Sequence, residues 1–241
     1  MDRHAVILAG GRGTRLRPYT VTLPKPLVPV ADMPILEIII RQLVDVGFTS
    51  ATIAVNHQAD LIRAFFGDGS RWGISLAYSL EQEPLGTMGP LRIIESLPEN
   101  FLVMNGDVLT DLHFDKFFRS HVDSGAMFTI SAASRKQSID FGVLHIDQCG
   151  SLTGFEEKPT IPYIVSMGVY GVSREVLDWI PANQSFGFDR LMHALLAAER
   201  DVRVLPHDGF WLDIGRPDDY QDVCEQWPQL ARRLLPGRHA S

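Results

Sequence analysis

In the first half of the chain, the pattern of apolar and polar residues alternates between strand-like and helix-like segments. Residues 5–9 and 101–104 are short, continuously apolar runs, which are typical of strands buried on both faces. After Pro34, apolar residues recur with helical spacing until Gly47, and glycine is a common helix stop. We predict further strands at 51–55 and 74–78, and helices at 61–66 and 87–97.

The second half has a more mixed pattern. It predicts helices at 114–121, 174–180, 189–199 and 217–225, and strands at 126–133, 141–146, 152–155, 164–170, 202–205 and 210–214. Alternating strands and helices predict an α/β fold, a Rossmann-like three-layer α/β/α architecture with a mostly parallel mixed sheet. Because no linker or repeat separates the halves, we expect a single domain over 1–241 with two lobes, 1–110 and 111–241.

A long proline-rich segment separates the first predicted strand from the first predicted helix. It runs from Gly10 to Pro34 and carries five prolines. A long loop inside a compact domain is usually functional, and proline restricts its backbone. We therefore expect this loop to hold chemical groups in fixed positions.

Composition narrows the class of protein. The chain has 241 residues, enough for a substantial core without disulfides or metals. Its two cysteines, Cys149 and Cys224, lack metal-ligand spacing, and such low cysteine usage suggests a reducing compartment. No apolar run is long enough for a signal or membrane-spanning segment. We therefore expect a cytoplasmic protein without a membrane partner.

Charge is unevenly distributed. The formal net charge of −7 argues against nucleic acid as a partner, because binding to a phosphate backbone needs a basic face. Residues 3–31 nevertheless contain no acidic side chain, and they include Arg12, Arg15, Arg17 and Lys25. A basic segment in an acidic protein indicates a local anion site.

The glycines Gly10, Gly11 and Gly13 lie inside this basic segment. Glycine allows backbone N–H groups to approach a polyphosphate, although a tight turn after a strand would also explain the glycines alone. The arginines beside them favour phosphate, since a guanidinium is a fixed fork for phosphate oxygens. The segment lacks the Gly-Lys-Ser/Thr of a Walker A loop, and Leu16 stands where a dinucleotide fingerprint needs its third glycine.

A second candidate group follows the predicted strand at 101–104. Asp107 comes after Asn105 and Gly106, as the glycine loop follows the strand at 5–9. Ligands of open α/β sheets bind at the carboxyl ends of strands, so one cleft could hold both.

Six motifs spread over the chain resemble the signature of one enzyme family, the nucleoside-triphosphate:sugar-1-phosphate nucleotidylyltransferases. They occur in the family's order: Leu8–Pro18, Leu23–Val30, Glu83–Thr87, Asn105–Asp107, Phe155–Pro159 and Trp211–Pro217. The resemblance implies a fold of the nucleotide-diphospho-sugar transferase type, with a nucleotide-binding lobe (1–110) and a sugar-phosphate-binding lobe (111–241). It also implies that a sugar-1-phosphate oxygen attacks the α-phosphate of a nucleoside triphosphate and displaces pyrophosphate.

This reaction needs positioning and charge neutralisation more than a general base. A phosphomonoester with a second pKa of about 6 is already largely dianionic at neutral pH. Two polyanions must then be held together while charge develops on the leaving pyrophosphate. By resemblance, Arg15, Lys25 and Asp107 are the catalytic residues, and Asp107 and Asp213 bind Mg²⁺, which favours one or two carboxylates plus phosphate oxygens. An aspartate after a strand is otherwise a turn or cap residue, and we assign only a structural role to Asp111.

The resemblance also assigns binding residues. Those for the nucleotide are Leu8, Ala9, Gly10, Gly11, Gly13, Thr14, Arg15, Glu81, Pro84, Gly86 and Thr87. Those for the sugar phosphate are Gly142, Glu157, Lys158, Ser166 and Gly168. A surface ion pair before Pro159 is the alternative for Glu157 and Lys158.

The segment Glu81–Gly86 is expected to contact the base, and Pro-Leu-Gly-Thr followed by Gly-Pro-Leu resembles guanylyltransferases. We therefore predict GTP with a mannose- or heptose-type 1-phosphate. UTP, dTTP or CTP with another sugar phosphate remains an alternative, as do a non-catalytic sensor of this fold and a Rossmann oxidoreductase. Trp179 and Trp227 are candidates for a subunit contact in a homo-oligomer.

Overall fold

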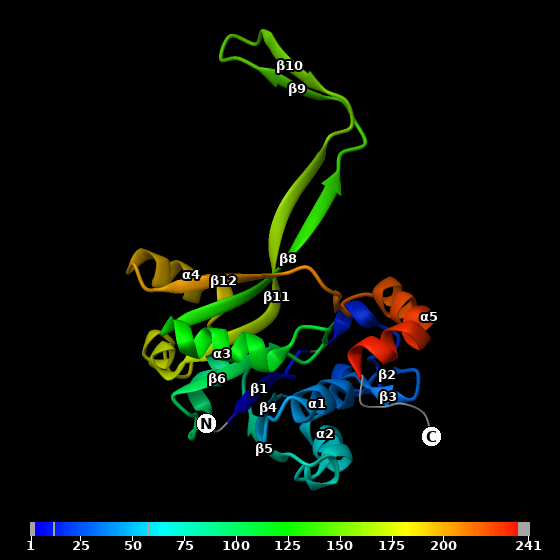
Figure 1. Ribbon diagram of the computed structural model, residues 1–241, viewed down its shortest axis with the longest axis vertical. Coiled ribbons are helices and arrows are strands. Elements are labelled where there is room, and N and C mark those ends of the chain that lie inside the picture. Colours follow the sequence, from blue (N-terminus) through cyan, green and yellow to red (C-terminus); the bar gives the residue numbers. More distant parts are fainter. Residues whose placement is uncertain (1–2, 12, 57, 236–241) are drawn as a thin grey trace.

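A computed structural model describes residues 3–11, 13–56 and 58–235 (Figure 1). Seven strands of this described chain form one sheet, in the order β12-β8-β11-β6-β1-β4-β5. They are β1 (His4–Leu8), β4 (Ser50–Val55), β5 (Ser75–Leu80), β6 (Asn100–Asn105), β8 (Phe128–Ser138), β11 (Thr160–Ser173) and β12 (Val202–His207). Only β11 runs antiparallel to its neighbours in this sheet, which confirms the mostly parallel mixed sheet.

Helices cover both faces of the sheet, as predicted. The side chains of α1 (Ile35–Asp45), α2 (Ala59–Phe66), α3 (Phe114–Ser124) and α5 (Pro217–Leu234) bury one face. The other face packs against α4 (Phe188–Ala197) and the short 3₁₀ helices η4 (Gly89–Ile93) and η5 (Arg174–Trp179).

The side chains of the central strands point alternately to the two faces of the sheet, which explains why both faces are apolar. Ala5 and Ile7 of β1 belong to the first core, and Val6 belongs to the second. Successive side chains of a strand point to opposite faces, so a strand covered on both faces must be apolar throughout. The result is the three-layer α/β/α fold.

Several predicted elements differ in detail from those observed. The helix expected at 87–97 is only η4, because the N–H groups of Met88 and Gly89 donate to the Phe186 carbonyl (2.9 and 3.1 Å) and not within a helix. The segment expected at 174–180 is also 3₁₀. Helix α5 continues past the expected end at 225 to Leu234, since Leu230 and Leu234 extend its buried stripe despite Pro228.

The proline-rich segment 10–34 is more ordered than expected of a loop. It contains the 3₁₀ helices η1 (Thr14–Leu16) and η2 (Lys25–Leu27), and a small ribbon of β2 (Pro29–Val30) with β3 (Met33–Pro34). Leu16, Val28 and Val30 are buried in the first core. The segment is therefore fixed to the body by apolar contacts and by prolines.

A two-stranded arm extends from the sheet. The outer halves of β8 and β11 pair alone, and a terminal hairpin of β9 (Val143–Ile146) and β10 (Leu152–Glu156) continues them away from the body (Figure 1). The structure describes every residue from Ser134 to Ile164, and none of them is buried. The expected strands at 141–146 and 152–155 thus form, but outside the core.

Strands of both predicted lobes share the one sheet: β6 lies beside β11, and β12 lies at its far edge. The lobe boundary at residue 110 falls at the end of β7 (Val108–Thr110), which pairs with β13 (Trp211–Asp213). Trp227, a candidate for a subunit contact, is buried in the first core, and Trp179 packs against the second. None of the helices in the described residues combines the length and apolarity that crossing a bilayer requires.

Candidate active site

A cavity of about 430 Å³ lies at the carboxyl ends of β1, β4 and β6. Ten predicted site residues line it: Leu8, Ala9, Gly10, Gly11, Lys25, Glu81, Pro84, Gly86, Thr87 and Asp107. The carboxyl ends of parallel strands meet at one edge of a sheet, so residues far apart in sequence converge there. The structure therefore brings the glycine loop, the base-binding segment and the Asn-Gly-Asp motif to one hollow.

Lys25 lies between two carboxylates at the end of this cavity. Its Nζ donates a hydrogen bond to Oδ2 of Asp107 and lies 3.9 Å from Oδ1 of Asp213. The lysine begins η2 and is only 9% exposed. The two aspartates meet because β13 pairs with β7, and the Ile214 N–H donates to the Asp107 carbonyl (3.1 Å). One buried cation thus neutralises part of a half-buried acidic pair.

The two aspartates fit a divalent cation. Oδ1 of Asp107 and Oδ1 of Asp213 are buried and have no hydrogen-bond partner within the described part of the chain. Burial, with the Asp107 carboxylate next to it, raises the pKa of Asp213 to about 6, although Lys25 and Arg15 act in the opposite direction. Among described residues, no three His, Cys, Asp or Glu side chains form a metal cage. Two carboxylates suffice for Mg²⁺, which keeps waters and takes phosphate oxygens as further ligands.

The glycine loop lies next to Lys25 and the two aspartates. Gly13 has a φ of +59°, and a Cβ there would lie 2.9 Å from Cγ2 of Thr20, whose hydroxyl donates to the Gly13 carbonyl (2.7 Å). Glycine is therefore required for this turn. Thr14 and Arg15 follow in η1, and the Arg15 guanidinium lies beside Gly215 at the start of α5. These residues lie next to the cavity but do not line it, and Arg12 is outside the described residues.

Glu81 is a buried carboxylate in the cavity wall. It follows β5, is 7% exposed, and Oε2 accepts the Leu85 N–H (3.0 Å). Its Oε1 lies so close to the loop that a Cβ on Gly10 would be 2.7 Å away. Burial raises the pKa of Glu81. A larger residue at position 10 would therefore displace this acceptor.

Gly86 provides the second close approach in the cavity wall. Its φ is +76°, and an added Cβ would lie 2.9 Å from the Phe186 carbonyl oxygen. Only glycine fits there without strain. The turn holds Pro84, Gly86 and Thr87 against the segment before α4 and leaves them exposed toward the cavity.

The predicted sugar-phosphate residues fall into two places. Ser166 and Gly168 lie at the root of the arm, where Gly168 (φ +77°) abuts the Asn105 side chain of the cavity. Gly142, Glu157 and Lys158 lie instead at the junction between β8–β11 and the β9–β10 hairpin, outside the cavity of this chain. The structure therefore brings together only the first two with the nucleotide loop.

Five further residues line the cavity without having been predicted: Pro26, Asn56, Pro90, Asn105 and Gly106. Asn56 follows β4 as Asp107 follows β6, so its position at a strand end was the available signal. Asp111, assigned a structural role, accepts hydrogen bonds from His207 (2.8 Å) and Arg233 and ties β12 to the end of α5. It takes no part in the cavity.

Known proteins share the sequence pattern and the fold of this chain. The sequence model of the nucleotidyl transferase family matches residues 4–229. The chain is 34% identical to mannose-1-phosphate guanylyltransferase catalytic subunit beta of Drosophila pseudoobscura pseudoobscura, over 96% of this chain and 64% of that protein. It is also 34% identical to UTP–glucose-1-phosphate uridylyltransferase of Synechocystis, over 90% and 61%. The chain thus spans less than two thirds of the length of these curated relatives.

Solved structures share the fold. HddC of Yersinia pseudotuberculosis, also solved in complex with GMP-PN, is 28% identical with a TM-score of 0.72 over 93% of this chain and 99% of that one. A putative glucose-1-phosphate thymidylyltransferase of Bacillus anthracis, 20% identical, superposes with a TM-score of 0.76 over 100% and 98%. The family match covers nearly the whole chain and includes each of the predicted motifs. The chain belongs to the nucleotidyl transferase family.

Proposed function

We propose that the protein joins a nucleoside triphosphate and a sugar-1-phosphate to give an NDP-sugar and pyrophosphate, with Mg²⁺. The observation that carries this proposal is the contact of the buried Lys25 with the half-buried carboxylates of Asp107 and Asp213 at the end of a glycine-lined cavity. A cation between two incompletely partnered carboxylates suits a polyphosphate with its metal ion. It offers neither a nucleophile with a base nor a hydride-transfer site, which argues against the oxidoreductase alternative.

The chain's residues divide the work by charge. An oxygen of the sugar phosphate attacks the α-phosphorus, the bond to the bridging oxygen breaks, and pyrophosphate leaves with the electron pair. In this proposal the backbone of Gly10, Gly11 and Gly13 holds phosphate oxygens, while Lys25 and Arg15 neutralise charge on the leaving group. Asp107 and Asp213 would hold Mg²⁺, which supplies Lewis-acid polarisation of the phosphoryl oxygens.

Guanine is the base that best fits the buried Glu81. An ionised carboxylate has two acceptor oxygens and no donor. The N1–H and amino groups of guanine are two adjacent donors, whereas uracil, thymine, cytosine and adenine each place an acceptor beside a donor on that edge. Oε1 of Glu81 faces Gly10, and Oε2 retains capacity beside the Leu85 N–H. A base that places an acceptor against the Glu81 carboxylate loses binding free energy, because neither group can donate a hydrogen bond. We therefore propose GTP as the substrate.

Relatives support this choice and keep one alternative open. The guanylyltransferase relative favours GTP with mannose-1-phosphate, within the predicted mannose- or heptose-type class, and the HddC complex with GMP-PN favours a guanine nucleotide. The Synechocystis uridylyltransferase has the same sequence identity to this chain as the guanylyltransferase, so UTP with a glucose-type phosphate is the second candidate. The retained Lys25, Asp107 and Asp213 argue against a non-catalytic sensor.

The proposal is tested by pyrophosphate release from a matrix of nucleoside triphosphates and sugar-1-phosphates with Mg²⁺. We expect GTP with mannose-1-phosphate or a heptose-1-phosphate to give the highest kcat/KM. Asp107→Asn is the matched inactive control, because it keeps the size of the side chain. Highest turnover with UTP would reject the base assignment, and no release from any pair would reject the reaction.

A further inference from the structure

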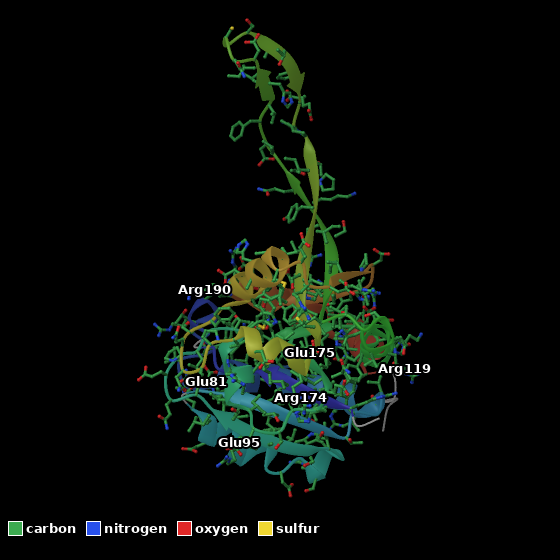
Figure 2. All side chains as sticks on the ribbon, turned by 90° about the vertical axis from the view of Figure 1, so that its left-hand side faces the viewer. Glu81, Glu95, Arg119, Arg174, Glu175 and Arg190 are labelled. Atoms are coloured by element: carbon green, nitrogen blue, oxygen red, sulfur yellow. The ribbon has the colours of Figure 1, made fainter. Side chains whose placement is uncertain are left out.

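The arm exposes apolar side chains that a folded protein normally covers. In the described chain, half of the exposed large hydrophobic residues lie between positions 141 and 164: Phe141, Leu144, Ile146, Leu152, Phe155, Ile161, Tyr163 and Ile164. Figure 2 shows side chains standing out along the arm with no layer over them. An isolated two-stranded ribbon is marginally stable in water, and a contiguous exposed apolar patch marks an interaction surface.

The root of the arm is fixed and directs it away from its own cavity. β8 is a single unbroken strand that pairs with β12 up to Ala133 and with β11 on both sides of that point. The Trp211 indole donates to the Met167 carbonyl (2.8 Å), and the Arg135 guanidinium lies 4.5 Å from the centre of the Trp211 ring. Folding the arm back would break these contacts and the ladder of β8.

The junction of the arm carries a compact polar group. Glu157 and Lys158 follow β10, and Lys158 has a φ of +45°, a conformation that costs a non-glycine residue energy and is concentrated at functional sites. Gly142 lies against the Phe155 ring and Oε2 of Glu157, since a Cβ there would lie 2.6 and 3.3 Å from them. At about 3.3 Å per residue, this junction lies on the order of 20 Å beyond Ser166 at the root.

The body of the same chain has a matching exposed surface. Tyr19, Val21 and Leu23, exposed by 43%, 63% and 39%, lie on the proline-rich segment shortly before Lys25, which lines the cavity. Tyr19 also contacts Tyr220 of α5, with ring centroids 4.5 Å apart. Because one chain carries both the apolar arm and this apolar rim, two copies related by a two-fold axis could cover both surfaces reciprocally.

From these observations we infer that two copies exchange their arms, and that Glu157 and Lys158 of one copy complete the cavity of the other. The inference rests on the proposed function for its catalytic readout. A cavity then contains the nucleotide loop, Lys25 and Asp107 from one chain, and the cation Lys158 from the second chain beside the sugar phosphate. Neither chain alone contains a complete site.

The test combines two inactive variants in one dimer. A chain with Asp107→Asn (intact arm) and a chain with Lys158→Ala (intact body) are co-expressed with different affinity tags and purified through both tags. In an exchanged dimer, one of the two sites receives an intact body and an intact arm, so turnover should be about half that of the wild type. Each variant alone should release pyrophosphate at no more than a few per cent of the wild-type rate. Lys136→Ala removes an exposed lysine of β8 that pairs with Pro162 and lies outside the predicted site residues, so it should leave the rate unchanged.

Other outcomes overturn the inference. Recovery of no mixed dimer, a mixed dimer without activity, or full activity of Lys158→Ala alone would each do so. A second measurement does not need catalysis: light scattering should give twice 26.9 kDa for the wild type and 26.9 kDa for Phe141→Ser/Phe155→Ser. A wild type that is dimeric but releases no pyrophosphate would reject the proposed reaction. The arm exchange would then be judged by the dimer mass of the wild type and by the monomer mass of the double variant.

Discussion

At the scale of single residues, the proposal that Glu81 selects the base can be tested with one substitution. Glu81→Gln keeps the shape of the side chain but replaces one acceptor with a donor. We expect kcat/KM for GTP to fall on the order of 10- to 100-fold, because one hydrogen bond to guanine is lost and two donors oppose each other. Use of UTP should fall less or rise, since an amide matches the N3–H and O4 of uracil. Steady-state kinetics with both nucleotides measures the ratio.

Glu95→Gln is the matched control for this change. Glu95 is an exposed carboxylate of the same region (Figure 2). Its substitution by glutamine removes the same charge, but at the protein surface. Its GTP to UTP ratio should equal that of the wild type. A Glu81→Gln variant with unchanged discrimination would show that another group recognises the base.

We expect Lys25 to oppose metal binding, which distinguishes it from a catalytic cation that does not contact the metal ligands. Lys25→Met should lower turnover by two to three orders of magnitude, because charge on the leaving group is no longer neutralised. The same change should strengthen Mn²⁺ binding on the order of tenfold or more, since the variant removes a positive charge whose Coulomb repulsion of a divalent cation near 4 Å in water is about 2 kcal/mol. Mn²⁺ titration by electron paramagnetic resonance measures the affinity without any turnover.

Two variants complete that comparison. Asp107→Asn should lower both turnover and Mn²⁺ affinity, because it removes a ligand. Lys116→Met, on the exposed side of α3, should change neither. Weaker Mn²⁺ binding in Lys25→Met would contradict the view that the lysine and the metal compete for the same carboxylates.

At the scale of elements, the packing of α3 on β8 and β11 buries a titratable side chain. His121 of α3 is fully buried, its Nδ1 lies 2.8 Å from the Thr129 hydroxyl, and it packs against Gly171, where a Cβ would lie 2.5 Å from the ring. Burial lowers the pKa of His121 from 6.5 to about 4. The unfolded chain therefore takes up a proton at a pH where the folded chain does not.

This difference fixes the sign of a pH effect on stability. Above pH 6.5 His121 is neutral in both states, and its stabilising contribution is complete. Between pH 6.5 and 4 the unfolded state gains the proton first, so the free energy of unfolding should fall by about 2 kcal/mol from pH 7.5 to pH 5 on account of this residue. Urea unfolding of the wild type and of His121→Asn, whose amide can still pair with Thr129, measures it. The variant should be less stable at pH 7.5 but should lose about 2 kcal/mol less on acidification.

Sequence periodicity predicted the central elements well because their burial is simple. Strands β1 and β6 are short apolar runs buried on both faces, and helix α1 buries an apolar stripe with helical spacing. The helix expected at 87–97 failed because a distant carbonyl, that of Phe186, takes the N–H groups of Met88 and Gly89. Spacing alone does not reveal such a tertiary hydrogen bond.

The site could be predicted in part for a similar reason. Gly10 and Asp107 follow strands β1 and β6, whose ends meet by topology, so their convergence could be expected. Lys25 reaches the same place on η2 of the proline-rich segment. The positions of Glu157 and Lys158 depend instead on the direction in which a ribbon leaves the sheet. That direction is set by β8 and by the Arg135–Trp211 contact, neither of which has a periodic signal.

At the scale of the whole molecule, the protein consists of a well-packed body and an uncovered arm. The pattern at 141–146 and 152–155 predicted strands, and these strands form outside both cores (Figure 1). The apolar content of a strand indicates only that some surface must cover it. Whether that surface belongs to the same chain depends on whether the strands that connect the arm to the body allow the arm to fold back.

The continuity of β8 has a consequence for amide exchange along a single strand. Residues 128–133 are hydrogen-bonded on both sides within the body, whereas residues 134–138 have β11 alone. Deuterium should enter the inner half slowly at every protein concentration, because only global opening exposes it. The outer half should exchange slowly in concentrated solution and quickly on dilution, when the covering copy dissociates. One strand would then show two exchange regimes that divide near Ser134, and its outer half would report the dissociation constant of the assembly.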